Sequence, residues 1–193
     1  MLYTNCAEPG KCRRAYGGRR LVTLCCALVC AASVPAVAST SGLAPVRSTH
    51  ASITELLQEG SDRSATFRAL VGAIAEADGI VYVEPGFCAF GHLNGCLLPF
   101  IALSAEGRYL RVVVTPDKNR KGRDQLIALI GHELQHALEV LQQPEIIDVT
   151  TMLAWYNRVG SPLKDRTGYE TSAARAAGDS VFTELQRNRA PAK

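Results

Sequence analysis

The segment GHELQH at residues 131–136 constrains the fold and chemistry of this chain more than any other. It lies inside residues 124–142, where apolar residues recur with the 3.6-residue period of an α-helix. His132 and His136 are four residues apart, so on a helix their rings project from one face, about one turn from each other. Two imidazoles at that spacing can bind one Zn²⁺ ion, and Glu133 beside them can serve as a general base.

The phase of this helix places the histidines away from its apolar residues. The apolar side chains that recur along it are Leu126, Ile130, Leu134, Ala137, Leu138 and Leu141. His132 and His136 fall on the opposite side. One face of the helix is therefore expected to pack in a core, while the other lines a cleft.

A catalytic zinc ion needs a third protein ligand and one open position for water. No histidine follows His136 in the sequence, so the third ligand is expected to be an acidic residue or a residue that precedes the motif. We favour Glu170, at the start of a helix expected over about 169–187, because the small residues there allow two helices to approach closely. Glu139, on the histidine helix itself, and His92 are the alternatives.

The segments around the histidine helix predict an α+β fold with a small mixed sheet. A short strand at residues 80–84 precedes two apolar runs, 97–104 and 108–115, which Ala105-Glu106-Gly107 joins as a hairpin. Helical patterns predict further helices over residues 52–77 with a break at Gly60-Ser61, over 148–159, and over about 169–187. The last of these helices is expected to carry Glu170.

Residues 1–38 have the pattern of an export signal. A basic stretch ends at Arg19-Arg20, the apolar run Leu21–Val34 follows, and Ala36-Val37-Ala38 is a cleavage site of the A-x-A type. The 14 residues of the apolar run are too few for a membrane-spanning helix, which needs about 20. We therefore expect a signal peptide cleaved after Ala38, with an uncleaved anchor as the alternative, and a secreted or periplasmic mature protein without a membrane span.

The mature chain is expected to consist of a flexible lead-in or short pro-segment at residues 39–51 and a single domain at 52–193. The whole chain has 21 basic and 18 acidic residues, but residues 1–38 contain five of the basic residues and one of the acidic, which leaves 16 and 17. Binding to nucleic-acid phosphates needs a basic surplus on the folded part. No nucleic-acid partner is therefore expected.

The mature chain keeps two cysteines, Cys88 and Cys96, in the segment FCAFGHLNGC. In an exported protein such a pair most simply forms a disulfide that closes a short loop. The alternative is a pair of metal-binding thiolates, but structural zinc sites usually place two to four residues between paired cysteines, and seven lie here.

HELQH, a hairpin before it and a glutamate further along the chain resemble a zincin metallopeptidase of the gluzincin type. The resemblance covers roughly residues 97–187, and HExxH is its only specific motif. It implies a zincin-like fold in which His132, His136 and Glu170 bind Zn²⁺ and Glu133 acts as the base. It also implies an edge strand above the cleft, within 97–104 or 108–115, that binds a peptide by strand addition.

One feature of the group is missing from this chain. Many gluzincins have an acidic residue four positions after the third ligand, whereas the corresponding residue here is Ala174. The residues that hydrogen-bond the histidine ring nitrogens that face away from the metal are therefore unassigned, with Asp179 and Asp148 as candidates.

The expected activity is hydrolysis of peptide bonds in a peptide or protein substrate, by zinc-bound water with Glu133 as general base. Candidates for donating a hydrogen bond to the oxyanion are Tyr169, Tyr156 and His92. The alternative is an exported non-catalytic protein whose structural metal site is formed by Cys88, Cys96, His132 and His136. Glu133 distinguishes the two interpretations, because a structural site has no need of a base.

Overall fold

The computed structural model describes residues 44–89, 93–115, 122–163 and 168–188, all of which belong to one compact unit, Ser41–Lys193. The predicted signal peptide at 1–38 lies outside these residues, and so does His92. Among the helices of the described part, none is both long and apolar enough to cross a membrane.

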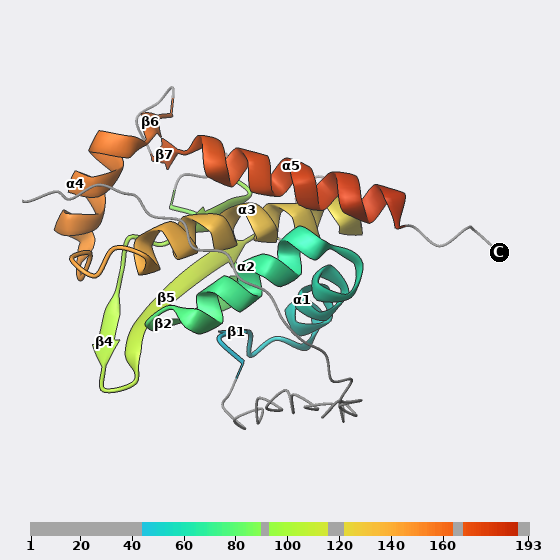
Figure 1. Cartoon of the computed structure of the whole chain (residues 1–193), viewed down its shortest axis with the longest axis horizontal. Helices are drawn as coiled ribbons and strands as arrows, with labels where there is room; N and C mark the ends of the chain where they lie inside the picture. The colour runs from blue at the N-terminus through green and yellow to red at the C-terminus, as the bar shows by residue number, and fades with distance from the viewer. Residues whose placement is uncertain (1–43, 90–92, 116–121, 164–167, 189–193) are drawn as a thin grey trace, which may run out of the picture. The chain divides into compact units, whose positions relative to one another are not determined.

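The α+β fold class predicted from the sequence is confirmed: a mixed sheet is followed by the histidine helix and by a region that carries Glu170 (Figure 1). In chain order the elements are β1 (Val46–Arg47), α1 (Ala51–Arg63), α2 (Ala65–Glu76), β2 (Gly79–Pro85), β3 (Gly95–Leu97), β4 (Ala102–Ser104), β5 (Gly107–Val114), α3 (Arg123–Leu141), α4 (Val149–Val159), β6 (Ser161–Pro162), β7 (Tyr169–Glu170) and α5 (Ser172–Arg187).

The main sheet has the strand order β1-β2-β5-β3, and β4 also pairs with β5. β2 runs parallel to β5, whereas β3 and β4 are antiparallel to it. The hairpin predicted around Ala105-Glu106-Gly107 joins β4 to β5, and Gly107 adopts a φ of 115°, which residues with a side chain rarely adopt. The predicted strand at 97–104 is divided into β3 and β4. Pro99 lies between them and lacks the amide hydrogen that a continuous ladder requires.

The lead-in predicted at residues 39–51 needs a correction within its described part. Val46 and Arg47 form β1, which pairs in parallel with β2, and Val46 is buried. A two-residue strand is too short to show alternating burial in the sequence. These residues therefore belong to the folded domain.

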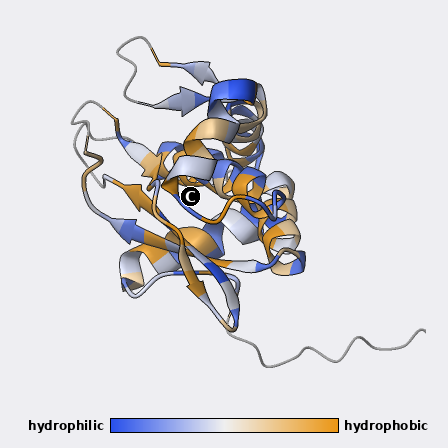
Figure 2. Cartoon of the chain, turned by 90° about the vertical axis from the view of Figure 1, so that its left-hand side faces the viewer, coloured by the Kyte–Doolittle hydropathy of each residue, from blue (hydrophilic) through white to orange (hydrophobic). Residues whose placement is uncertain are grey.

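The histidine helix α3 is the central helix of the fold. It lies between α5 on one side and α1 and α2 on the other, with the sheet packed against it (Figure 1), and hydrophobic residues gather along the strands and between the strands and the helices (Figure 2). The predicted apolar stripe is largely buried, but the polar side is buried too. Glu133, His136 and Glu139 are all less than a tenth exposed, whereas His132 is partly exposed, and both histidines line a cavity, as expected of this face.

The break predicted at Gly60-Ser61 occurs four residues later, because α1 continues to Arg63. Gly60 supports close packing: a Cβ atom there would lie 2.9 Å from Cγ2 of Ile127. The break is at Ser64, a fully buried residue whose hydroxyl accepts a hydrogen bond from the Phe67 amide at 3.0 Å and so caps α2. The same hydroxyl donates to Glu184 of α5 at 2.6 Å.

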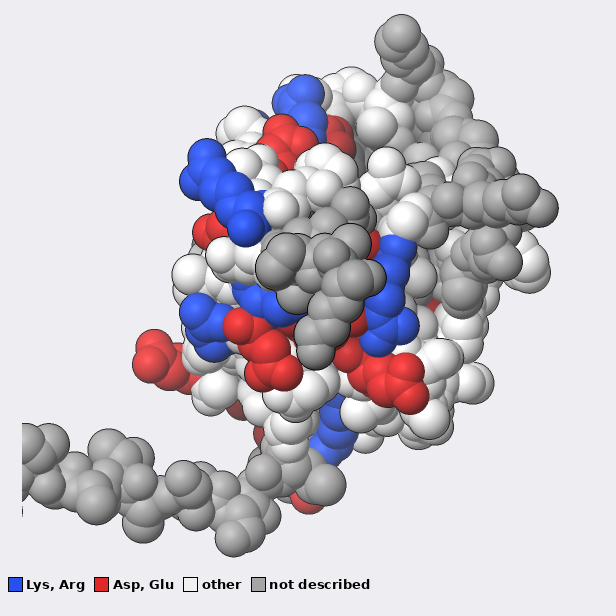
Figure 3. Space-filling model, turned by 90° about the vertical axis from the view of Figure 1, so that its right-hand side faces the viewer, with Lys and Arg blue, Asp and Glu red and all other residues white. Residues whose placement is uncertain are grey.

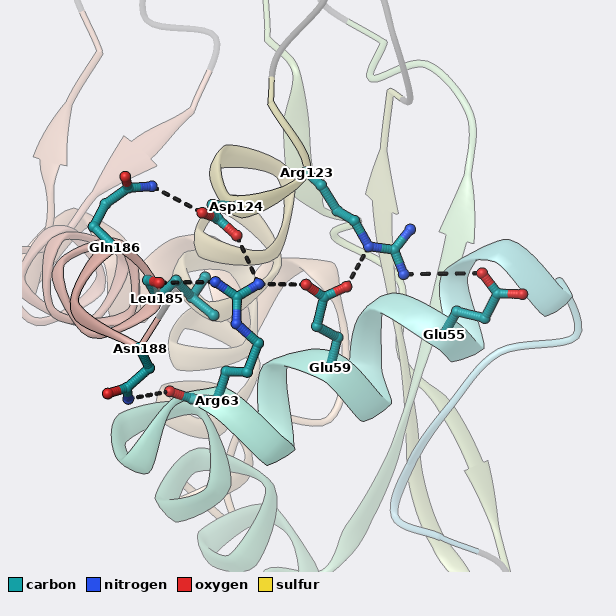
Figure 4. A network of polar contacts seen from close by, with 8 residues as sticks. All are labelled: Glu55, Glu59, Arg63, Arg123, Asp124, Leu185, Gln186 and Asn188. Carbon is teal, nitrogen blue, oxygen red and sulfur yellow. Dashed lines mark hydrogen bonds and ion pairs between the residues drawn. The ribbon is translucent and has the colours of Figure 1, made fainter. Parts of the chain in front are cut away.

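A polar network fixes the amino-terminal end of α3 (Figure 4). Arg63 of α1 donates to Asp124 at 2.9 Å and to the carbonyl of Leu185 at 2.8 Å, so one guanidinium joins three helices. It also pairs with Glu59, which in turn binds Arg123. Acidic and basic side chains lie next to one another on this end of the surface (Figure 3). Asp124 in the first turn also has the favourable sign for the helix dipole.

Candidate metal centre

Three side chains that can bind a metal ion converge in the interior: His132 and His136 from α3, and Glu170 from β7. The atoms that they offer as ligands all lie within 4.8 Å of one another. Oε1 of Glu170 is 3.6 Å from Nε2 of His132 and 3.6 Å from Nε2 of His136. Ligand atoms about 2.0–2.2 Å from one tetrahedral zinc ion are separated by about 3.4 Å. The observed spacing therefore fits a shared metal ion.

Glu170 was expected at the start of the last helix. It lies instead on β7, the short strand before that helix. α5 begins at Ser172 because the Thr171 hydroxyl accepts a hydrogen bond from the Ala174 amide at 3.1 Å and so caps the helix. The backbone amide of Thr171 donates to Oε1 of Glu170 at 2.9 Å. The start of α5 thus helps to orient the carboxylate that faces the histidines.

Small residues let α5 approach α3 closely, as expected. A Cβ atom at Gly178 would lie 3.2 Å from the Cβ of His132, and one at Gly131 would lie 2.9 Å from Cγ2 of Val181. This close approach brings the beginning of α5, and Glu170 just before it, against the histidine face of α3.

Glu139, considered above as a rival third ligand, contacts the centre from its outer side. Its Oε2 is 3.1 Å from Nδ1 of His136, and its Oε1 accepts a hydrogen bond from the Thr171 hydroxyl at 2.7 Å. Because a carboxylate accepts here, the hydrogen-bond network assigns a proton to Nδ1 of His136. One buried carboxylate therefore links a histidine on α3 to the residue beside Glu170.

Tyr156 of α4 completes this outer layer. Its hydroxyl lies 3.3 Å from Nδ1 of His136 and 3.3 Å from the His136 carbonyl oxygen, and it also hydrogen-bonds Glu139. Burial, together with the charge of Glu139, strongly raises the pKa of Tyr156. The hydroxyl therefore stays protonated and acts as a hydrogen-bond donor on the side of His136 that carries Nδ1.

The protonation preferences of the three candidate ligands follow from their surroundings. Burial alone would lower the pKa of His136, but hydrogen bonds with Glu139 and Glu170 raise it to about 9. Burial lowers the pKa of His132 despite the nearby charge of Glu170. Burial would raise the pKa of Glu170, but the two histidines hold it below its usual value. The nearby carboxylates thus favour positive charge on His136, whereas burial disfavours it on His132.

Glu133 lies beside the three candidate ligands and against the edge of the sheet. It accepts a hydrogen bond from the backbone amide of Leu97 in β3, and a Cβ atom at Gly95 would lie 3.0 Å from its Oε1. Burial raises the pKa of Glu133 to about 7, because a carboxylate out of contact with water is costly to ionise. This value suits a group that exchanges protons near neutrality.

The centre opens into a cavity of about 510 Å³ between β3 and α4, whose lining includes Glu133 and the three candidate ligands. Cys88 and Cys96 also line it, joined by a disulfide as the sequence analysis expected. With both sulfurs in a disulfide, the alternative Cys₂His₂ site is contradicted. No known family model, curated protein or solved structure matches this chain.

Among the candidates for oxyanion donors, the two tyrosines line this cavity but already have hydroxyl partners. Tyr169 donates to Oδ1 of Asn157 at 2.5 Å, and Tyr156 faces His136. The oxyanion role of these tyrosines and of His92 stays a prediction. Of the two aspartates considered as histidine partners, Asp148 caps α4 at an exposed position, whereas Asp179 lines a shallow groove beside His132.

Replacing Glu139 with Gln is expected to weaken zinc binding by about 10–100-fold, the usual effect of losing an outer partner of a ligand. The amide keeps one acceptor oxygen, so only one of His136 and Thr171 retains an acceptor. Competition with a chromogenic chelator measures the affinity. The exposed Glu145→Gln variant, which removes the same charge, is the control and should bind zinc as the wild type does. Equal affinities for both variants would contradict this role of Glu139.

Proposed function

We propose that this protein is an exported zinc-dependent peptidase. The observation that carries the proposal is the convergence of two histidine Nε2 atoms on one glutamate oxygen, each 3.6 Å from it, beside a buried fourth group, Glu133. Two histidines and one glutamate are a donor set typical of catalytic zinc sites, in which a fourth position stays open. A structural zinc site usually fills that position with another protein ligand.

Glu133 is the proposed general base and acid. When bound, zinc would lower the pKa of water at the open position and polarise the carbonyl of the substrate. The carboxylate of Glu133 takes the proton of the attacking water and later delivers it to the leaving amine. The hydrogen bond from Leu97 holds this carboxylate against β3, next to the three candidate ligands.

The edge strand β3 supports a peptide as the substrate. The amide of Leu98 donates to Arg111, and the amide of Thr115 donates to Asn94, so the backbone groups of Gly95 and Leu97 point away from β5. The Leu97 amide already binds Glu133. The other outward backbone groups of Gly95 and Leu97 have no hydrogen bond within the part of the chain that the structure describes, and an extended peptide laid along β3 can pair with them. Strand addition would place a peptide bond beside Glu133 and the metal ligands.

The disulfide supports the proposed location outside the cytoplasm. Cys88 is buried, and the bond holds β3 to the segment that follows β2. Disulfides persist in secreted and periplasmic proteins, where the environment is oxidising. The signal peptide predicted at residues 1–38 agrees with the same location.

The metal dependence of hydrolysis tests this proposal. A chelator should abolish cleavage of an unfolded protein substrate, and added zinc should restore it. Glu170→Gln should weaken zinc binding by more than the roughly 100-fold expected for loss of an outer partner, because a neutral amide replaces a charged ligand. Zinc content after dialysis and initial cleavage rates are the measurements. Glu76→Gln, at an exposed position on α2, is the control. Chelator-resistant cleavage, or full zinc binding by the Glu170 variant, would refute the assignment.

A further inference from the structure

We propose that the cavity beside the three candidate ligands binds a large apolar side chain of a peptide substrate, next to the bond that is cleaved. This inference rests on the proposed peptidase function and names the substrate class of the same site. The cavity measures about 510 Å³, within the size range of small-molecule sites and large enough to admit an apolar side chain beside the metal ligands. Its apolar lining includes Leu93, Leu97, Leu98, Leu129, Met152 and Leu153.

The apolar walls continue directly from the proposed catalytic groups. Leu129 lies one helical turn before Glu133 on α3 and packs against β3, because a Cβ atom at Gly95 would lie 3.0 Å from its side chain. Met152 and Leu153 form the opposite wall from α4. A peptide paired with β3 directs alternate side chains to one face. A side chain on the face toward α4 would therefore enter the apolar space.

The charges of the lining indicate which substrates the cavity disfavours. Among the described residues that line it there is no lysine or arginine, whereas Glu133 and Glu170 both contribute carboxylates. An acidic side chain placed among the apolar residues of the lining would lose water and would face these two carboxylates. The lining thus favours apolar side chains over acidic ones.

Leu153 of α4 is an exposed part of the cavity lining. It is 43% exposed, so a polar replacement leaves the core of the protein unchanged, yet its side chain lines the cavity. Val159 lies on the same helix, is 52% exposed, and is not part of the described lining. The pair offers a test variant and a matched control, Leu153→Lys and Val159→Lys.

Peptide binding by a zinc-loaded full chain that carries Glu133→Gln tests this inference without cleavage. The probes are two peptides, blocked at both ends, that differ only in a central Leu or Asp, and titration calorimetry gives the dissociation constants. We expect the Leu peptide to bind at least tenfold more tightly, in line with the roughly 10–200-fold selectivity of apolar pockets. Leu153→Lys should weaken binding of the Leu peptide at least tenfold, whereas Val159→Lys should leave it unchanged.

Two results would overturn the inference: equal binding of the two peptides, or equal effects of the two lysine variants. Absence of binding by either peptide would also overturn it. Failure of the peptidase proposal would give a different result. The wild-type protein would then bind zinc and prefer the Leu peptide but cleave nothing, so the apolar site would be present without the activity. Circular dichroism of both lysine variants checks that each is folded.

Discussion

Glu133→Gln is expected to reduce the rate of peptide hydrolysis by about 10²–10⁴-fold, the usual contribution of a general acid–base group. An amide cannot take a proton from the attacking water at neutral pH, so the step that Glu133 is proposed to assist is lost. Zinc binding should persist, because the three candidate ligands, His132, His136 and Glu170, are unchanged. Initial rates on an unfolded protein substrate, measured together with zinc content, separate these two effects.

The geometry around Glu133 makes this variant a clean test. The amide oxygen of Gln can still accept the hydrogen bond from the Leu97 backbone, so β3 should keep its place beside α3. Glu76→Gln, which removes a charge from an exposed position, should cleave at the wild-type rate. Wild-type hydrolysis by a zinc-loaded Glu133 variant would show that another group moves the proton, and the role proposed for Glu133 would be wrong.

Local patterns in the sequence predict the parts of this fold that depend on neighbours along the chain. The period of apolar residues locates α3, and the 3.6-residue turn of the helix then places His132 and His136 on one face. The hairpin before β5 is equally local, because Gly107 supplies the turn. Each of these features needs only a few consecutive residues to be recognised.

The remaining features depend on contacts between distant segments. Asp179 and Asp148 were the candidates for an acidic partner of the histidines, but the carboxylate that contacts His136 in this way is Glu139. The partner of Glu139, Thr171, lies 32 residues away. Its spacing of three from His136 is visible in the sequence, but residues at this spacing are also neighbours on a solvent-exposed helix face. Burial of that face requires α5, and the sequence alone does not show which side of α3 it covers. Similarly, β1 forms only because β2 offers an edge.

The carboxyl-terminal end of α3 depends on another distant contact, with Arg108 of β5. This side chain is 5% exposed, and its guanidinium donates hydrogen bonds to four backbone carbonyl oxygens. Two belong to the last turn of α3, Val140 at 3.2 Å and Leu141 at 2.6 Å, and two to the following loop, Gln143 at 2.7 Å and Ile146 at 3.1 Å. The last turns of a helix leave carbonyls without partners, and α3 has no basic residue of its own there. Arg108 supplies both the donors and the charge that this end of the dipole favours.

Arg108→Met is therefore expected to lower the free energy of unfolding by about 3–5 kcal/mol, since each buried acceptor left unpaired costs about 1–3 kcal/mol and some regain water. Methionine keeps much of the apolar volume, so the loss reports on the hydrogen bonds. Arg111→Met on the same strand is the control: the Arg111 side chain is 51% exposed and pairs with Glu84, a surface ion pair worth at most about 1 kcal/mol. Urea denaturation of the metal-free proteins measures both. Equal losses of unfolding free energy for the two variants would contradict this role of Arg108. They would mean that apolar packing alone holds the end of α3, and that the carbonyls bound by Arg108 reach water when its guanidinium is removed.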